Sequence, residues 1–126
     1  GLGEEVYREI PFVRKLVGSV SDREDLGDYI EKRDRILTAG DEIKAAVESQ
    51  DRERLNKGRI KYAEELRFLA LVKNTENARR KISKQMNFVR DNRNLSDERK
   101  EELLKQLEDR RNKIIQRANQ LLQKFD

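Results

Sequence analysis

The fold is decided by the stretch from Asn94 to Phe125, which reads NLSDERKEELLKQLEDRRNKIIQRANQLLQKF. Ser96 can cap a helix, because its hydroxyl oxygen can accept a hydrogen bond from the free backbone N–H groups of the first turn. Negative charge favours a helix start, and Asp97 and Glu98 supply it. Apolar residues then recur at heptad spacing: Leu104, Leu107, Ile114, Ala118, Leu121 and Phe125. Arg111 fills the one gap, so the pattern predicts a long helix with a coiled-coil seam.

The stretch before this helix carries a second seam, formed by Tyr62, Leu66, Leu69, Val72, Thr75, Ala78, Ile82, Met86 and Val89. It predicts a helix over about residues 59–90. Residues 91–94 are a short polar loop, so the two helices should be antiparallel neighbours.

The short loop also predicts a register for the hairpin. With the turn centred near Arg93, residue i should lie opposite about residue 187 − i. Three hydrophobic contacts and one polar neighbour follow: Phe68 near Ala118, Leu71 or Val72 near Ile114 or Ile115, Tyr62 near Phe125, and Thr75 across from Arg111.

Residues 21–58 predict a first long helix followed by a turn. Ser21 and Glu24 fit a capping box, and the heptad phase continues across Gly40, which favours one helix over residues 22–49. In the alternative, Gly40 ends one helix and Asp41 caps the next. Asp51 should cap a short helix through Leu55 that ends at residues 56–58.

Residues 1–20 are expected to form a docking segment. Pro11 suits the first position of a helix, and Phe12, Val13 and Leu16 then lie on one apolar stripe. Our first interpretation is a short helix that docks on one end of the long helices. In the alternative, the same three residues bind the rest of a larger protein, so they are candidate partner-binding residues.

Composition fits this reading of the elements. Charged residues make up 43% of the chain and hydrophobic residues 35%, so thin apolar seams must run along long, surface-rich helices. We therefore predict one all-α domain over residues 1–126, an elongated antiparallel helical bundle with a C-terminal coiled-coil hairpin. Its parts would be residues 1–20, 21–58 and 59–126.

The residue types that most often carry out catalysis are scarce in this chain. It contains no Cys and no His, which removes thiolate ligands, disulfides and the commonest general base. No paired carboxylates sit in an apolar context. We therefore expect no enzyme, no cofactor and no metal site. No apolar run approaches the length of about 20 residues that spans a bilayer, so we expect no membrane segment within this chain.

A basic stripe over residues 73–93 offers an alternative function. It holds seven bases and two acids, and Arg79, Arg80, Lys81 and Lys84 would be the candidate nucleic-acid-binding residues. In the predicted register, Arg79 and Arg80 lie opposite Glu108 and Asp109, and Lys84 lies opposite Glu101 and Glu102. That charge matching within the chain argues against nucleic-acid binding.

Three segments in order resemble a known family. They are Ile10-Pro11-Phe12-Val13-Arg14-Lys15 followed by Val17-Gly18, then Tyr29-Ile30-Glu31-Lys32-Arg33-Asp34, and then Leu95-Ser96-Asp97-Glu98-Arg99-Lys100. Together they resemble the helical C-terminal region of a large polyvalent protein-associated domain, which occurs in long phage and prophage proteins of the internal virion or ejection type.

The resemblance implies an excised C-terminal piece with a non-catalytic structural or interaction role. Its partners would be other segments of the parent protein or other virion proteins, and a homo-oligomer stays open. Its location would be the virion or the bacterial cytoplasm, and we expect no secretion signal in this chain.

Overall fold

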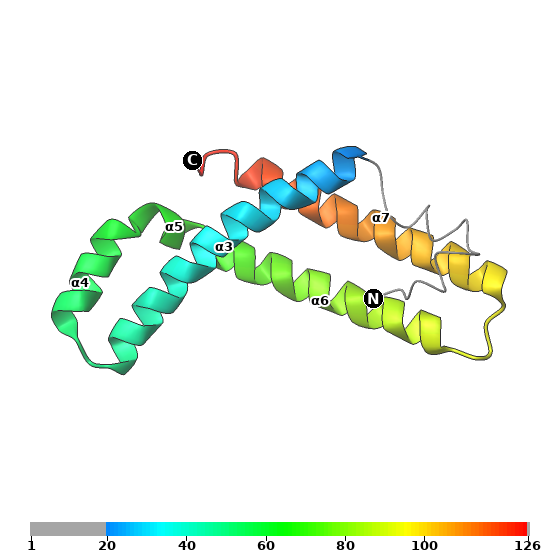
Figure 1. Cartoon of the computed structure of the whole chain (residues 1–126), viewed down its shortest axis with the longest axis horizontal. Helices are drawn as coiled ribbons and strands as arrows, with labels where there is room; N and C mark the ends of the chain where they lie inside the picture. Colours follow the sequence, from blue (N-terminus) through cyan, green and yellow to red (C-terminus); the bar gives the residue numbers. More distant parts are fainter. Residues whose placement is uncertain (1–19, 126) are drawn as a thin grey trace.

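A computed structural model describes residues 20–125 of the chain. Every regular element in this part is a helix: α3 Val20–Glu48, α4 Arg52–Lys61, α5 Ala63–Arg67, α6 Leu69–Asp91 and α7 Asp97–Leu121. The predicted all-α fold is therefore confirmed (Figure 1).

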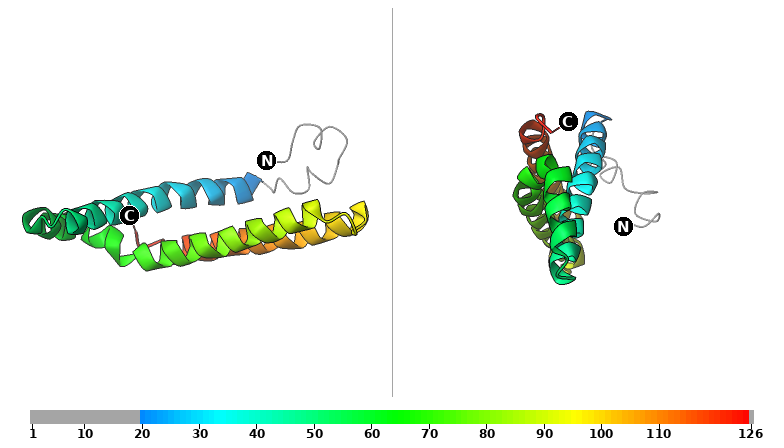
Figure 2. Two further views of the ribbon diagram at one scale, coloured as in Figure 1. Left: turned by 90° about the horizontal axis from the view of Figure 1, so that it is seen from below. Right: turned by 90° about the vertical axis from the view of Figure 1, so that its left-hand side faces the viewer.

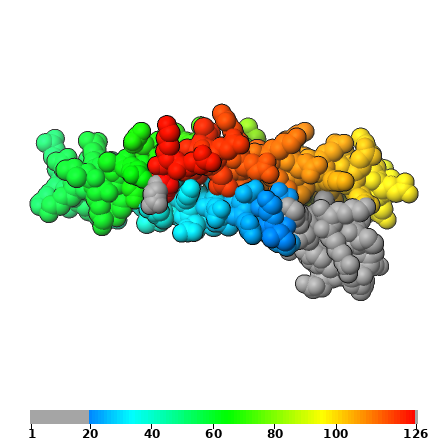
Figure 3. Space-filling view, turned by 90° about the horizontal axis from the view of Figure 1, so that it is seen from above, coloured from blue at the N-terminus to red at the C-terminus, as the bar shows by residue number. Residues whose placement is uncertain are grey.

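Two helical hairpins overlap to give an elongated body. At one end α3 turns back into α4, and at the other end α6 turns back into α7 (Figure 1). The first half of α3 lies along one side of the α6–α7 hairpin, as the turned views in Figure 2 show. In the space-filling view of Figure 3, α3 and the C-terminal end of α7 lie side by side.

The first long helix is continuous, as predicted. α3 passes through Gly40 without a break and ends at Glu48. A Cβ atom at Gly40 would stand 2.9 Å from Cδ1 of Leu69, so the missing side chain lets α6 approach closely. The helix already includes Val20, which places Ser21 inside it instead of at the predicted cap.

The turn after α3 confirms one predicted cap and corrects one predicted end. The Asp51 side chain accepts from the backbone N–H of Arg54 at 3.0 Å, as expected of an N-cap. Helix α4 does not end at Gly58, however, but continues to Lys61. Gly58 is buried, and a Cβ there would stand 2.9 Å from Cδ1 of Ile43. This glycine serves the close packing of α4 on α3.

The predicted helix over residues 59–90 is broken in two places. Tyr62 and Phe68 both leave helical dihedral angles, with φ −107°, ψ 21° and φ −103°, ψ 4° respectively. The backbone stays hydrogen-bonded at both breaks, because the N–H of Tyr62 donates to the carbonyl of Gly58 at 2.8 Å and the N–H of Phe68 to the carbonyl of Glu65 at 3.1 Å. The breaks redirect the chain from the α3–α4 hairpin into α6, and they turn Phe68 and Leu69 toward the core.

Two hydrophobic clusters hold the described residues together. The first lies where α3, α6 and α7 meet, and its buried members are Tyr29, Ile36, Val72, Ile115, Ala118, Leu122 and Phe125. The second fills the outer half of the α6–α7 hairpin, with Ile82, Met86, Val89, Leu104 and Leu107. From Val72 onward the predicted α6 seam is buried except for the half-buried Ala78. On α7, Ile115 and Leu122 are buried, whereas the predicted Ile114 is half-buried and the predicted Leu121 is 42% exposed.

The predicted register is wrong where a contact across the hairpin tests it directly, because Arg111 lies against Met86, ten positions from the Glu76 that the rule 187 − i gives. Val72 and Ile115 share one core cluster, as expected. Phe68 packs against Phe125, with ring centroids 5.6 Å apart in an edge-to-face arrangement, and lies against the cluster that contains Ala118. Phe125 reaches Phe68 because α7 ends at Leu121 and the following turn brings Phe125 back onto the core. Phe125 therefore meets Phe68 and not the predicted Tyr62.

Candidate interaction surfaces

A polar cluster joins α3 to α6 beside the first hydrophobic cluster. The hydroxyl of Tyr29 donates to Oε2 of Glu76 at 2.7 Å. Arg33 reaches Oε1 of the same carboxylate at 3.2 Å, and Arg79 reaches Oε2 at 2.8 Å. Both oxygens of Glu76 are therefore occupied by donors from two helices.

The cluster changes the ionisation of its members. Burial alone would raise the pKa of Glu76, but hydrogen bonds from Tyr29 and Arg79 and the nearby guanidinium charges outweigh it and lower that pKa. The pKa of Tyr29 is raised, first because the phenol is buried and next because it donates to the Glu76 carboxylate. A tyrosine that stays protonated beside a paired carboxylate stabilises the packing of two helices and does not act as a general base. We call Tyr29, Arg33, Glu76 and Arg79 the lock, because they hold α3 against α6.

A small polar hollow of about 240 Å³ lies beside this cluster, lined by Arg33, Glu76, Arg79, Arg80, Ser83 and Arg111. Three of its four arginines pair with carboxylates: Arg33 and Arg79 with Glu76, and Arg111 with Glu108. The hollow nevertheless keeps a net positive charge, because its four arginines face a single lining carboxylate, Glu76.

Arg111 behaves largely as its place in the seam predicts. Its side chain is 31% exposed, and one terminal nitrogen pairs with Glu108 one turn earlier on α7. Its neighbour across the hairpin is Met86, whose sulfur lies 3.9 Å from Nη1, and not the predicted Thr75. The hydroxyl of Thr75 donates instead to the carbonyl of Leu71 on its own helix.

The predicted charge matching across the hairpin is wrong. Arg79 pairs with Glu76 on its own helix, and Arg80 donates to the side-chain oxygen of Asn77. Within residues 20–125, neither Lys81 nor Lys84 forms an ion pair, and both are exposed. The basic stripe is therefore not neutralised by acids across the hairpin, and nucleic-acid binding stays an alternative function.

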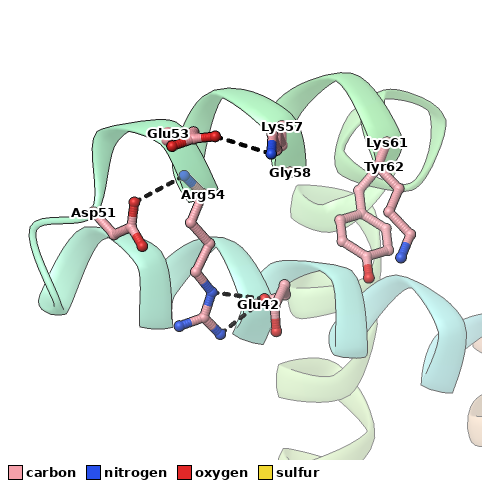
Figure 4. A pocket seen from close by; sticks show the side chains of 8 residues that line it. All are labelled: Glu42, Asp51, Glu53, Arg54, Lys57, Gly58, Lys61 and Tyr62. Carbon is pink, nitrogen blue, oxygen red and sulfur yellow. Dashed lines mark hydrogen bonds and ion pairs between the residues drawn. The ribbon is translucent and has the colours of Figure 1, made fainter.

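The α3–α4 end carries a polar depression, which Figure 4 shows from close by. Arg54 pairs with Glu42 at 2.8 Å, and Lys57 pairs with Glu53 at 3.0 Å. The lining holds three acids and three bases, so it presents no net charge to a ligand. We assign it no function.

A different surface lies on the α6–α7 hairpin, where two hollows of about 450 and 370 Å³ follow one another. The first has an apolar lining of Phe88, Val89, Leu103 and Leu107. The second is lined by Leu71, Ala78, Ile114, Ala118 and Leu121 together with polar neighbours. Arg110 lines both hollows, so they form one surface, which we call the open groove.

The open groove faces away from α3. On α6, Glu76 contacts α3 and Ala78 lines the groove; on α7, Asn119 bonds to Asp25 of α3 and Arg117 lines the groove. Two residues correspond to about 200° around an α-helix, so the groove and α3 occupy opposite faces. The side views of Figure 2 agree, because no described helix covers that side.

The open groove is basic as well as apolar. Its charged lining residues are Lys84, Arg110, Lys113 and Arg117, and no acidic residue lines it. Within the described part of the chain, none of these four bases pairs with a carboxylate.

These geometric findings stand without support from relatives. No family model, no curated protein and no solved structure matches this chain. The resemblance to the large polyvalent protein-associated domain therefore stays a prediction. The predicted partner-binding residues Phe12, Val13 and Leu16 lie outside the described residues.

The expectations about membrane segments and metal sites can be compared with residues 20–125. No helix there is long and apolar enough to cross a membrane. No group of three Asp or Glu side chains in that part could hold a metal ion.

Sequence reasoning missed the open groove. Phe88, 71% exposed, stood between two seam positions and was not counted with either. A signal was available in residues 110–124, which contain five bases and no acid. Bases also suit the C-terminal end of a helix, so the run alone does not reveal that Arg110, Lys113 and Arg117 line a groove.

Proposed function

We propose that this chain is a non-catalytic helical interaction module of a larger phage- or prophage-derived protein, and that the open groove binds its protein partner. The groove itself carries the proposal. A contiguous apolar surface on the uncovered side of a helical hairpin is typical of protein interaction sites. The phage context comes from the family resemblance alone.

Exposure of large side chains along the groove supports this function. Phe88 and Leu121 are 71% and 42% exposed at its two ends. Burial of a phenylalanine or leucine side chain contributes about 1.5–3 kcal/mol, so a partner that covers both would gain substantially. Aromatic side chains are also enriched among the residues that dominate binding energy.

Site-specific photocrosslinking would test the proposal in the natural context. The parent protein would carry a photoreactive phenylalanine analogue at Phe88 in phage-producing cells, and at Ile60 in the matched control. Ile60 is 81% exposed and lies on α4, away from the groove. We expect discrete protein adducts from position 88 and none from position 60. Equal labelling from both positions, or none from position 88, would contradict the proposed function.

Nucleic-acid binding is the second candidate, and one observation favours it. Arg80, Lys81 and Lys84 are exposed on α6, and in the described part none of them pairs with a carboxylate. Phosphate contacts made by such bases would show a strong salt dependence. Crosslinks from position 88 to nucleic acid instead of protein would favour this candidate.

A further inference from the structure

We infer that the occupant of the open groove is an acidic amphipathic helix from outside this chain, about 18 residues long. This inference rests on the proposed function and names the chemistry of its partner. It follows from the shape of the groove, from its charge and from its position relative to α3.

The shape of the groove fits a helix. Two antiparallel helices leave a furrow on each side. On one side of the α6–α7 hairpin, α3 contacts both helices, through Tyr29 and Glu76 and through Asp25 and Asn119. The open groove is the corresponding furrow on the other side. A helix that laid an apolar face into it would pack as helices do in grooves of this kind.

The length of the groove sets the length of the helix. On α7 the apolar lining runs from Leu103 to Leu121. At 1.5 Å per residue this span is about 27 Å, which a helix of about 18 residues covers.

The charge of the groove selects an acidic partner. Arg110 and Arg117 stand one heptad apart along its edge, with Lys113 between them and Lys84 on the facing helix. Acidic residues at seven-residue spacing beside the apolar stripe of a partner helix would meet these bases. Complementary charges of this kind raise association rates and exclude wrong partners.

The same charges exclude a second copy that binds through its own groove. A two-fold dimer of that kind brings identical surfaces together, so four bases would face four bases. Because α3 lies on the opposite side of the hairpin, we assign the groove to a helix from outside the chain.

A pair of designed peptides of three heptads would test this inference with the full chain. Both would carry Leu and Ile at the a and d positions, with Glu at e and g in the acidic peptide and Lys in the basic one. Binding would be followed by fluorescence anisotropy at low and high salt. We expect the acidic peptide to bind at least tenfold more tightly, with a preference that shrinks as salt rises.

Two fourfold variants would locate the site. The groove variant combines Lys84→Glu, Arg110→Glu, Lys113→Glu and Arg117→Glu, and we expect at least a tenfold loss of acidic-peptide affinity. The matched control combines Lys44→Glu, Arg59→Glu, Lys73→Glu and Lys105→Glu, exposed bases that line no part of the groove. The control changes the net charge by the same amount, and its affinity for the acidic peptide should stay within about twofold of that of the parent chain. If the groove variant fails to fold, Phe88→Ser must weaken the same binding.

Equal binding of the two peptides, or no binding of either, would overturn the inference. Equal loss of acidic-peptide affinity in both variants, or displacement of the peptide by DNA, would also overturn it. A dimer that the groove variant dissociates would overturn it as well. If position 88 still crosslinks to protein when the acidic peptide shows no preference, the partner chemistry is wrong and the proposed function stands. If position 88 also gives no adduct, both fail.

Discussion

The hydroxyl of Tyr29 on α3 donates to the carboxylate of Glu76 on α6 at 2.7 Å, and the tyrosine side chain is fully buried. This contact links residues that are 47 positions apart in the chain. It fixes how the first long helix lies on the hairpin, and therefore which side of the hairpin stays open.

The first prediction concerns this hydrogen bond. Tyr29→Phe keeps the ring and removes only the donor to a charged group, so we expect a loss of about 2 kcal/mol of unfolding free energy. Urea denaturation at neutral pH would measure it. Tyr62→Phe is the matched control, because the hydroxyl of the half-buried Tyr62 forms no hydrogen bond with residues 20–125. Equal effects of the two changes would contradict the prediction.

The second prediction concerns pH. The pKa of Glu76 is lower in the folded chain than its ordinary value of 4.5. Its stabilising contribution is therefore complete above that value and is lost as the pH falls through the folded-state pKa. Glu76→Gln should cost about 2 kcal/mol at pH 7, and the difference from the parent chain should shrink as the pH falls below about 4.5.

Denaturation at pH 7, 5 and 3 would follow this difference. Glu53→Gln is the control, because Glu53 is 78% exposed in its pair with Lys57 and exposed pairs contribute little. A Glu76→Gln cost that stays constant across the three pH values would refute the proposed ionisation.

The long helices could be predicted from sequence because their signals are local. Heptad spacing and the caps at Ser96 and Asp51 depend on residues a few positions apart, and both caps form as expected. Gly58 shows the limit of local signals. After Asn56 and Lys57, this glycine indicated the end of a helix. In the structure it lets Ile43 of α3 approach α4 closely, which only the tertiary structure reveals.

The pairing of charges was not predictable for a related reason. Arg79 and Glu108 each have a carboxylate or guanidinium partner on the same helix, three residues away. Such local pairs compete with pairs across the hairpin, and a register estimate cannot decide between them. The open groove was missed because it depends on which side of the hairpin α3 occupies, and contacts between residues far apart in the chain, such as Tyr29 with Glu76 and Asp25 with Asn119, set that side.

The third prediction compares two glycines in the middle of α3. At Gly27 an added Cβ meets nothing within 4 Å, so Gly27→Ala should stabilise the chain by about 1 kcal/mol through helix propensity. At Gly40 the same methyl group would stand 2.9 Å and 3.2 Å from the two methyl carbons of Leu69. Gly40→Ala should therefore show no gain and should lower the midpoint of thermal unfolding. A similar gain at both positions would refute the close approach of α6 at Gly40.

The fourth prediction separates a structural arginine from surface bases. Arg79 pairs with Glu76, so Arg79→Gln should lower the free energy of unfolding by about 1–2 kcal/mol. The double change Arg80→Gln and Lys84→Gln should stay within about 0.5 kcal/mol of the parent, as surface substitutions do. Denaturation of the two variants would show the contrast.

DNA titration of the same double variant tests the second candidate function. We expect the parent chain to bind duplex DNA no tighter than about 10⁻⁴ M at physiological salt, the weak end of non-specific binding. Micromolar binding with a steep salt slope, lost in the double variant while it stays folded, would make nucleic-acid binding the better reading.

The last prediction concerns the end of the chain that the structure describes. Phe125 is 1% exposed, its ring meets Phe68 edge to face, and the guanidinium of Arg35 lies 4.7 Å from the ring centroid. Truncation of a buried phenylalanine removes its transfer energy and leaves a cavity, so Phe125→Ala should cost about 3–5 kcal/mol. Phe88→Ala, the same change at a side chain that is 71% exposed, should cost less than about 1 kcal/mol. Urea denaturation of both variants would compare them. A small effect at Phe125 would mean that the turn after α7 does not close this end of the core, and the register that joins Phe125 to Phe68 would then be wrong.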